Sequence, residues 1–164
     1  GVDIKGQGTV GLITYLRTDS TRISDEAMEQ ANGYIGEAYG EQYLATQEIT
    51  KKTGAKIQDA HEAIRPSDIR RTPVMVKESL SRDQFRLYQL IWKRFTASRM
   101  SSAVYETTNV KIGAGKYRFT VAASKVAFDG FMSVYTSDDD EKAENNLLLR
   151  SIDESSKLDL IELE

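Results

Sequence analysis

The stretch from Ser81 to Met100 constrains the fold most strongly, because it predicts a long amphipathic helix. Ser81 and Gln84 have the spacing of a capping box, in which each side chain satisfies a backbone amide of the first turn. Apolar residues then recur at helical spacing: Phe85, Tyr88, Ile91, Trp92 and Phe95. Basic residues lie off this stripe, so we interpret its aromatic rings as core rather than as a platform for stacking bases. The chain must therefore fold around this helix.

Composition excludes several classes of protein. The 164 residues contain no cysteine and one histidine, which rules out disulfides and makes a zinc site implausible. No apolar run has the roughly 20 residues of a membrane span, so we expect no membrane partner, and the absence of cysteine favours a cytoplasmic protein. The first residue is not methionine and reads as the middle of a loop. We expect the chain to be a fragment of a longer protein.

Charge is unevenly distributed along the chain. Residues 51–100 carry twelve lysines and arginines against five acids, whereas residues 103–164 carry seven against twelve. The formal net charge of −3 conceals this segregation. A basic region of this kind is expected where a protein faces a polyanion, although a solvated helical surface explains it equally well.

The remaining pattern predicts an α+β protein. Ser24 should cap a helix over residues 25–39, and Pro66 should end a helical turn on which His61 and Arg65 share one face. We expect a loop at 1–9, a short strand or strand-like segment at 10–15 and a basic linker at 70–79. The segment after Met100 is rich in β-forming residues and predicts strands at 104–112, 116–123, 126–135 and 158–163, with turns at 113–115 and 129–130. The predicted domains are a mainly helical one at 1–101 and a β-rich antiparallel segment at 102–164.

The stretch Gly11–Arg22 carries the chemistry. Its apolar residues continue through Tyr15 to Leu16, and Arg17, Asp19 and Arg22 follow closely. A tyrosine hydroxyl, with a pKa of about 10, is a poor nucleophile unless nearby positive charge favours the phenolate. An arginine can also hold a phosphodiester as charge develops on it. A Tyr-x-Arg pair thus permits transfer of a DNA strand to tyrosine, but it is equally compatible with a structural tyrosine beside a surface arginine.

Three segments together resemble the type IA DNA topoisomerases, in their bacterial topoisomerase I form. The first is Gly-Leu-Ile-Thr-Tyr-Leu-Arg-Thr-Asp-Ser-Thr-Arg at 11–22, which is similar to the active-site segment of the family. The second is Ala-His-Glu-Ala-Ile-Arg-Pro-Ser at 60–67, and the third is the helix segment at 84–100. The resemblance spans essentially the whole chain.

The resemblance implies a role for each matching residue. Tyr15 would attack a phosphodiester of single-stranded DNA and carry the 5′ phosphate, while Arg17 would hold the scissile phosphate. His61, Arg65, Asp19 and Arg22 would contact DNA. Such an enzyme passes a strand through the break, reseals it without ATP and relaxes negative supercoils. Residues 1–101 would be the tyrosine domain and 102–164 part of the arch that hinges the gate.

The resemblance also implies parts that this sequence does not match. Family members bind Mg²⁺ in a Toprim domain that precedes this region, and the acidic run at 138–141 lacks the spacing of its ligands. We therefore expect the chain to bind no metal and to be catalytically inactive on its own. A tyrosine recombinase is disfavoured, because its tyrosine follows the catalytic histidine and arginines. A non-catalytic module that binds single-stranded DNA remains the alternative.

Overall fold

The computed structural model describes residues 1–45, 61–136 and 157. The chain forms two compact units: Gly1–Ala103 and Asp129–Tyr135 build the first, and Val104–Phe128 belongs to the second. Helices and antiparallel strand pairs make up the described part, so the predicted α+β class is confirmed. The predicted strand at 158–163 and the acidic run at 138–141 lie outside the described residues. The two predicted domains stay a prediction.

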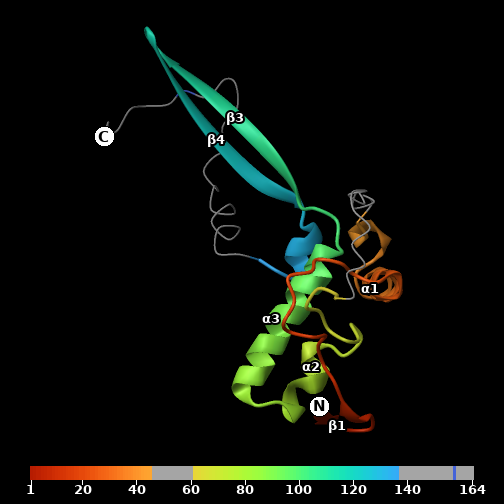
Figure 1. Ribbon diagram of the computed structural model, residues 1–164. Coiled ribbons are helices and arrows are strands. Elements are labelled where there is room, and N and C mark those ends of the chain that lie inside the picture. The colour runs from red at the N-terminus through yellow and green to blue at the C-terminus, as the bar shows by residue number, and fades with distance from the viewer. Residues whose placement is uncertain (46–60, 137–156, 158–164) are drawn as a thin grey trace. The chain divides into compact units, whose positions relative to one another are not determined.

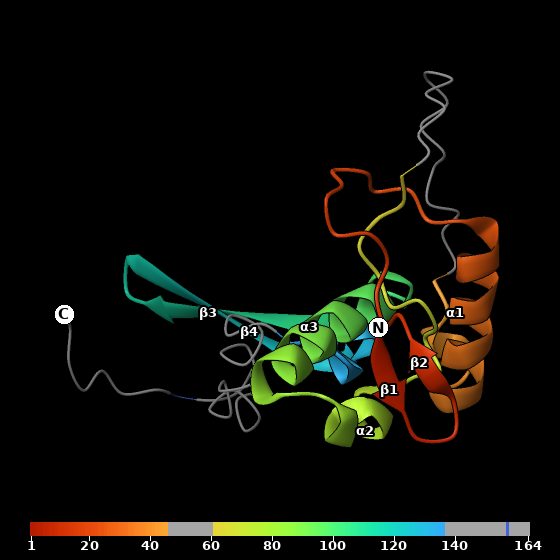
Figure 2. The same ribbon diagram turned by 60° about the horizontal axis from the view of Figure 1, so that its bottom comes forward.

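The first unit begins with a hairpin of β1 (Val2–Ile4) and β2 (Gly8–Val10), in which Val2 pairs with Val10 (Figure 2). The prediction of a loop at 1–9 is therefore wrong, and the segment predicted at 10–15 is a regular strand only at Val10. Gly6 and Gly8 adopt positive φ angles of 81° and 72°, which allow the chain to turn back at once. Beyond Val10, the only bridge in the described part of this stretch joins Ile13 to Pro66.

Helix α1 (Asp25–Ala38) confirms the predicted helix and its cap. The Ser24 side chain accepts a hydrogen bond from the amide of Ala27. One face is buried through Ala27, Ala31 and Ile35. Gly40 follows the helix with a φ of 109°, and its amide donates to the carbonyls of Ile35 and Gly36 before a short turn, η1 (Glu41–Tyr43).

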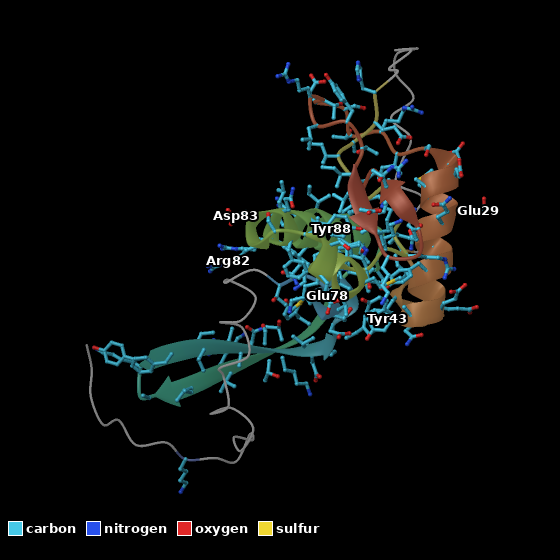
Figure 3. The ribbon with its side chains drawn as sticks, turned by 90° about the horizontal axis from the view of Figure 1, so that it is seen from below. Glu29, Tyr43, Glu78, Arg82, Asp83 and Tyr88 are labelled. Carbon is cyan, nitrogen blue, oxygen red and sulfur yellow. The ribbon has the colours of Figure 1, made fainter. Side chains whose placement is uncertain are left out.

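Helix α3 (Arg82–Ser98) is the centre of the first unit and confirms the capping box of Ser81 and Gln84. Tyr88, Trp92, Phe95 and Thr96 are buried on it. Its first residues, Arg82 and Asp83, project outward in Figure 3, whereas Tyr88 lies among the packed side chains. The indole of Trp92 donates to the carbonyl of Ile69 at 2.8 Å, so the helix also fixes the segment before it.

The predicted linker at 70–79 instead contains a helical turn, α2 (Pro73–Val76), followed by η2 (Lys77–Ser79). Pro73 is at the start of this turn, where a missing amide hydrogen costs nothing. Val76 is fully buried and completes the core around α3. No described helix is long and apolar enough to cross a membrane.

The second unit contains the long antiparallel hairpin of β3 (Val104–Ala114) and β4 (Tyr117–Phe128) (Figure 1). The expected break near residue 124 and the strand at 126–135 are wrong, because β4 runs unbroken to Phe128. The chain then forms η3 (Gly130–Ser133) within the first unit. Gly130 makes this turn possible: its φ is 49°, and a Cβ there would lie 2.5 Å from the carbonyl oxygen of Ser101.

Candidate active site around Tyr15

The tyrosine loop, residues 15–22, exposes the side chains singled out in the sequence. Tyr15 has 62% of its surface exposed, and Arg17, Asp19 and Arg22 are also exposed. Hydroxyl groups shape the loop from within: Thr18 accepts from the amide of Ser20 at 3.0 Å, and Ser20 from that of Arg22 at 3.2 Å. Serine and threonine favour such local turns over a helix. The loop therefore presents its charged and phenolic groups to solvent.

A bridging segment, Glu62–Ser67, holds the chain on the Tyr15 side of this loop. The amide of Thr14 donates to the carbonyl of Arg65 at 3.0 Å, and the Thr14 hydroxyl donates to the carbonyl of Ala63 at 2.8 Å. In return, that hydroxyl accepts from the amide of Arg65 at 2.9 Å. The amide of Ser67 donates to the carbonyl of Leu12 at 3.0 Å. Tyr15 therefore follows directly after a firmly bound residue.

The same segment holds the other end of the loop. The amide of Ala63 donates to the carbonyl of Arg22 at 2.8 Å. The Glu62 carboxylate accepts from the amide of Ser24 at 3.1 Å, just where α1 begins. The bridging segment thus joins two stretches that lie on either side of the loop.

His61 lies beside Tyr15, with 6.1 Å between the ring centroids and 28° between the ring planes. The predicted helical turn over 61–65 is wrong, because the backbone there pairs with the strand-like stretch around Thr14. The imidazole and the phenol nevertheless come together. The structure therefore brings two of the predicted site residues to one place.

Arg65 is turned inward rather than toward solvent. Its side chain is only 14% exposed, and its Nε and Nη2 donate to Glu62 Oε2 at 3.1 and 2.6 Å. Its Nη1 donates to the carbonyl of Pro66 at 3.0 Å. Burial raises the pKa of Glu62, but the hydrogen bonds from Ser24 and Arg65 outweigh it, and the pKa lies below its ordinary value. Glu62 is therefore held as a carboxylate.

The guanidiniums of Arg17 and Arg22 differ from that of Arg65. Neither side chain, nor that of Asp19, has a hydrogen bond or ion pair within the part of the chain that the structure describes. Two positive groups on the same loop as an exposed phenol can bind phosphate oxygens, with Arg able to do so bidentately. The loop can thus offer a nucleophile and phosphate-binding groups together.

The Mg²⁺ implied by the resemblance does not fit the described residues. They contain no group of three or more His, Cys, Asp or Glu side chains that could hold a metal ion.

Residues 8–164 match the family described as DNA topoisomerase. The chain belongs to this family. The topoisomerase chain is also similar to the full-length topoisomerase I of Thermotoga maritima, with 42% sequence identity and a TM-score of 0.67. The match covers 80% of this chain and 21% of the other. The resemblance to bacterial type IA topoisomerases that its motifs carry is thereby confirmed.

Sequence reasoning missed Thr14 and Glu62, the side chains that hold the tyrosine loop of this topoisomerase chain. Glu62 had a local signal, since it precedes Arg65 by three positions and could pair with it. Thr14 had none, because its partners lie far along the chain.

Proposed function

We propose that Tyr15 is the nucleophile of a topoisomerase that cuts and reseals one strand of DNA and so relaxes negative supercoils. The observation that carries this proposal is the position of Tyr15. Tyr15 is 62% exposed on a loop bound at both ends, two residues before Arg17 in sequence and beside the His61 ring. A tyrosine with a purely structural role would instead be expected to lie buried in the core.

In the proposed reaction, the phenolic oxygen of Tyr15 bonds to phosphorus and the bond from phosphorus to the 3′ oxygen breaks. The phenol gives up its proton and the leaving 3′ oxygen takes one up. The strand end stays attached to the protein as a 5′-phosphotyrosine. One phosphodiester replaces another, so the reverse reaction reseals the strand without ATP. Arg17 stabilises the charge that develops on the phosphate oxygens.

His61, Arg22 and Asp19 are proposed to contact the single strand on either side of the scissile phosphate. Arg22 suits a phosphate, whereas Asp19 suits an amino group on a base because its carboxylate repels phosphates. Arg65 was expected to bind DNA as well, but three of its five N–H groups donate to Glu62 and Pro66.

We assign the remaining chemistry to other parts of a longer protein. A Toprim domain would supply Mg²⁺ and the group that protonates the 3′ oxygen. Residues 1–101 act as the tyrosine domain and 102–164, with the β3–β4 hairpin, as part of the gate arch. Such an enzyme works on chromosomal DNA in the cytoplasm.

The test replaces Tyr15 with phenylalanine in the longer protein that contains this chain. Tyr15→Phe should lower cleavage of a single-stranded oligonucleotide to below about 10⁻³ of the wild-type rate, because no other group takes the phosphate. Tyr117→Phe is the matched control, since Tyr117 is equally exposed at 62% and lies on the hairpin. The alternative, a non-catalytic module that binds single-stranded DNA, predicts unchanged cleavage in Tyr15→Phe.

A further inference from the structure

We infer that Glu62 is a positioning residue. Together with Arg65, it binds the far end of the tyrosine loop to the bridging segment and so holds Tyr15 in the orientation needed to attack the phosphodiester. The catalytic part of this inference rests on the function proposed above. The structural part concerns the loop alone and can be tested separately.

The contacts of Glu62 point in two directions. One carboxylate oxygen accepts from the amide of Ser24, at the start of α1. The other accepts two hydrogen bonds from the Arg65 guanidinium. Arg65 is itself bound through its backbone to Thr14, the residue before Tyr15. The chain of contacts Ser24, Glu62, Arg65, Thr14 therefore spans the loop from end to end.

Burial separates this pair from an ordinary surface ion pair. The side chains of Arg65 and Glu62 are 14% and 20% exposed, against 57% and 64% for Arg70 and Glu37. Exposed pairs are screened by solvent and contribute little, whereas a shielded pair with several hydrogen bonds holds its geometry. The pair of Glu62 and Arg65 is therefore suited to fixing a loop.

The same geometry argues against direct DNA binding by this pair. Arg65 directs its Nε, Nη1 and Nη2 donors at Glu62 and Pro66. A lone carboxylate beside the proposed phosphate site would repel DNA, and the neighbouring guanidinium neutralises it. The pair thus adds rigidity to the site with no net charge of its own.

Loss of the Glu62 carboxylate should loosen the loop without detaching it. The bonds of Thr14 to Ala63 and Arg65 and the bond of Ala63 to Arg22 remain. Tyr15 would then sample more positions, and a misplacement of about 1 Å can cost on the order of 10²-fold in rate. Affinity for DNA should barely change, because no DNA contact is lost.

The experiment compares Glu62→Ala and Glu62→Gln in the longer protein, with Glu37→Ala as the matched control. Glu37 also binds an arginine through both carboxylate oxygens, at 2.9 Å each, but lies on the exposed part of α1. Three quantities are measured: single-turnover cleavage at saturating oligonucleotide, the Kd of the same oligonucleotide in a Tyr15→Phe background, and amide hydrogen exchange in the peptide 15–24.

We expect Glu62→Ala to slow cleavage at least tenfold, to change Kd less than twofold and to speed exchange in the peptide 15–24. The Glu62→Gln side chain can still accept a hydrogen bond from the amide of Ser24, so its cleavage rate should fall less. Glu37→Ala should match the wild type in all three. If Glu62→Ala does not fold, Glu62→Gln and Arg65→Lys decide by the same measurements.

Two results would overturn the inference. Wild-type cleavage and exchange in the Glu62 variants would show that the carboxylate positions nothing. A Kd weakened by the same factor as the rate would assign the pair to DNA contact instead. Failure of the proposed function would look different: Tyr15→Phe would still cleave, while the exchange measurement would still report on the loop.

Discussion

Arg17 and Arg22 both carry an exposed guanidinium on the tyrosine loop, but we expect different contributions from them. Arg17 lies two residues after the proposed nucleophile, so Arg17→Ala should lower the single-turnover cleavage rate about 10²- to 10³-fold with little change in Kd. Arg22 lies at the far end of the loop, so Arg22→Ala should weaken binding and reduce the slope of log K against log salt by about 0.7. Quenched single-turnover reactions measure the cleavage rate, and binding titrations at several salt concentrations measure Kd and its salt dependence.

The test is whether Arg17→Ala affects the cleavage rate more than the affinity for DNA. If Arg17→Ala weakened binding as much as it slowed cleavage, Arg17 would be an ordinary phosphate contact. Arg82→Ala is a suitable control, because Arg82 is also exposed but lies at the start of α3.

At the site, sequence reasoning was strongest where the functional groups are close together in the sequence. Tyr15, Arg17 and Arg22 could be proposed as site residues because a phenol and two guanidiniums lie within eight residues of one another. The approach of His61 to Tyr15 could be expected only from the resemblance, since the helical turn that we derived for His61 is wrong. The inward turn of Arg65 depends on Glu62, Pro66 and the pairing with Thr14. Such long-range contacts leave no periodic signal.

At the level of the elements, Gly130 controls where the chain leaves β4. Gly130→Ala should destabilise the first unit strongly, because it adds the cost of a left-handed residue, about 1–2 kcal/mol, to a clash with the backbone at Ser101 and Ser102. Gly115→Ala is the matched control: its φ of 58° carries the same backbone cost, but nothing lies within 4 Å of a Cβ there. Urea denaturation followed by the fluorescence of Trp92, the single tryptophan, measures the first unit.

We expect a clearly lower denaturation midpoint for Gly130→Ala and little change for Gly115→Ala, which lies in the second unit. Equal midpoints in both variants would mean that residues 129–135 do not contribute to the first unit.

The elements that could be predicted are those that carry their own boundary signals. Ser24 and the pair Ser81 and Gln84 satisfy amides within one turn, so both helix starts are local properties. The segment expected at 10–15 is not one continuous strand, because its pairing depends on partners elsewhere in the chain. Val10 finds its partner in Val2, whereas Ile13 pairs with Pro66, far along the chain. The turn at 129–130 had a local signal in Asp129 and Gly130, but the close approach of Gly130 to the backbone at Ser101 had none.

For the whole molecule, the 164 residues alone should not relax a supercoiled plasmid, with or without Mg²⁺. They cover 21% of the related topoisomerase I, and their described part offers no cluster of metal ligands. Gel electrophoresis of plasmid topoisomers measures this directly, with the longer protein as the positive control. Magnesium-dependent relaxation by these residues alone would contradict the proposed division of the active site.

The most direct measurement identifies the residue that carries the DNA. The longer protein is trapped on a cleaved oligonucleotide, digested with nuclease and trypsin, and analysed by mass spectrometry. Trypsin cuts the protein after Lys5 and Arg17 and releases the peptide 6–17, in which Tyr15 is the single tyrosine. We predict that this peptide carries a nucleotide 5′-phosphate on Tyr15. A phosphate on any other residue, or no covalent adduct during active cleavage, would contradict the assignment of Tyr15 as the nucleophile.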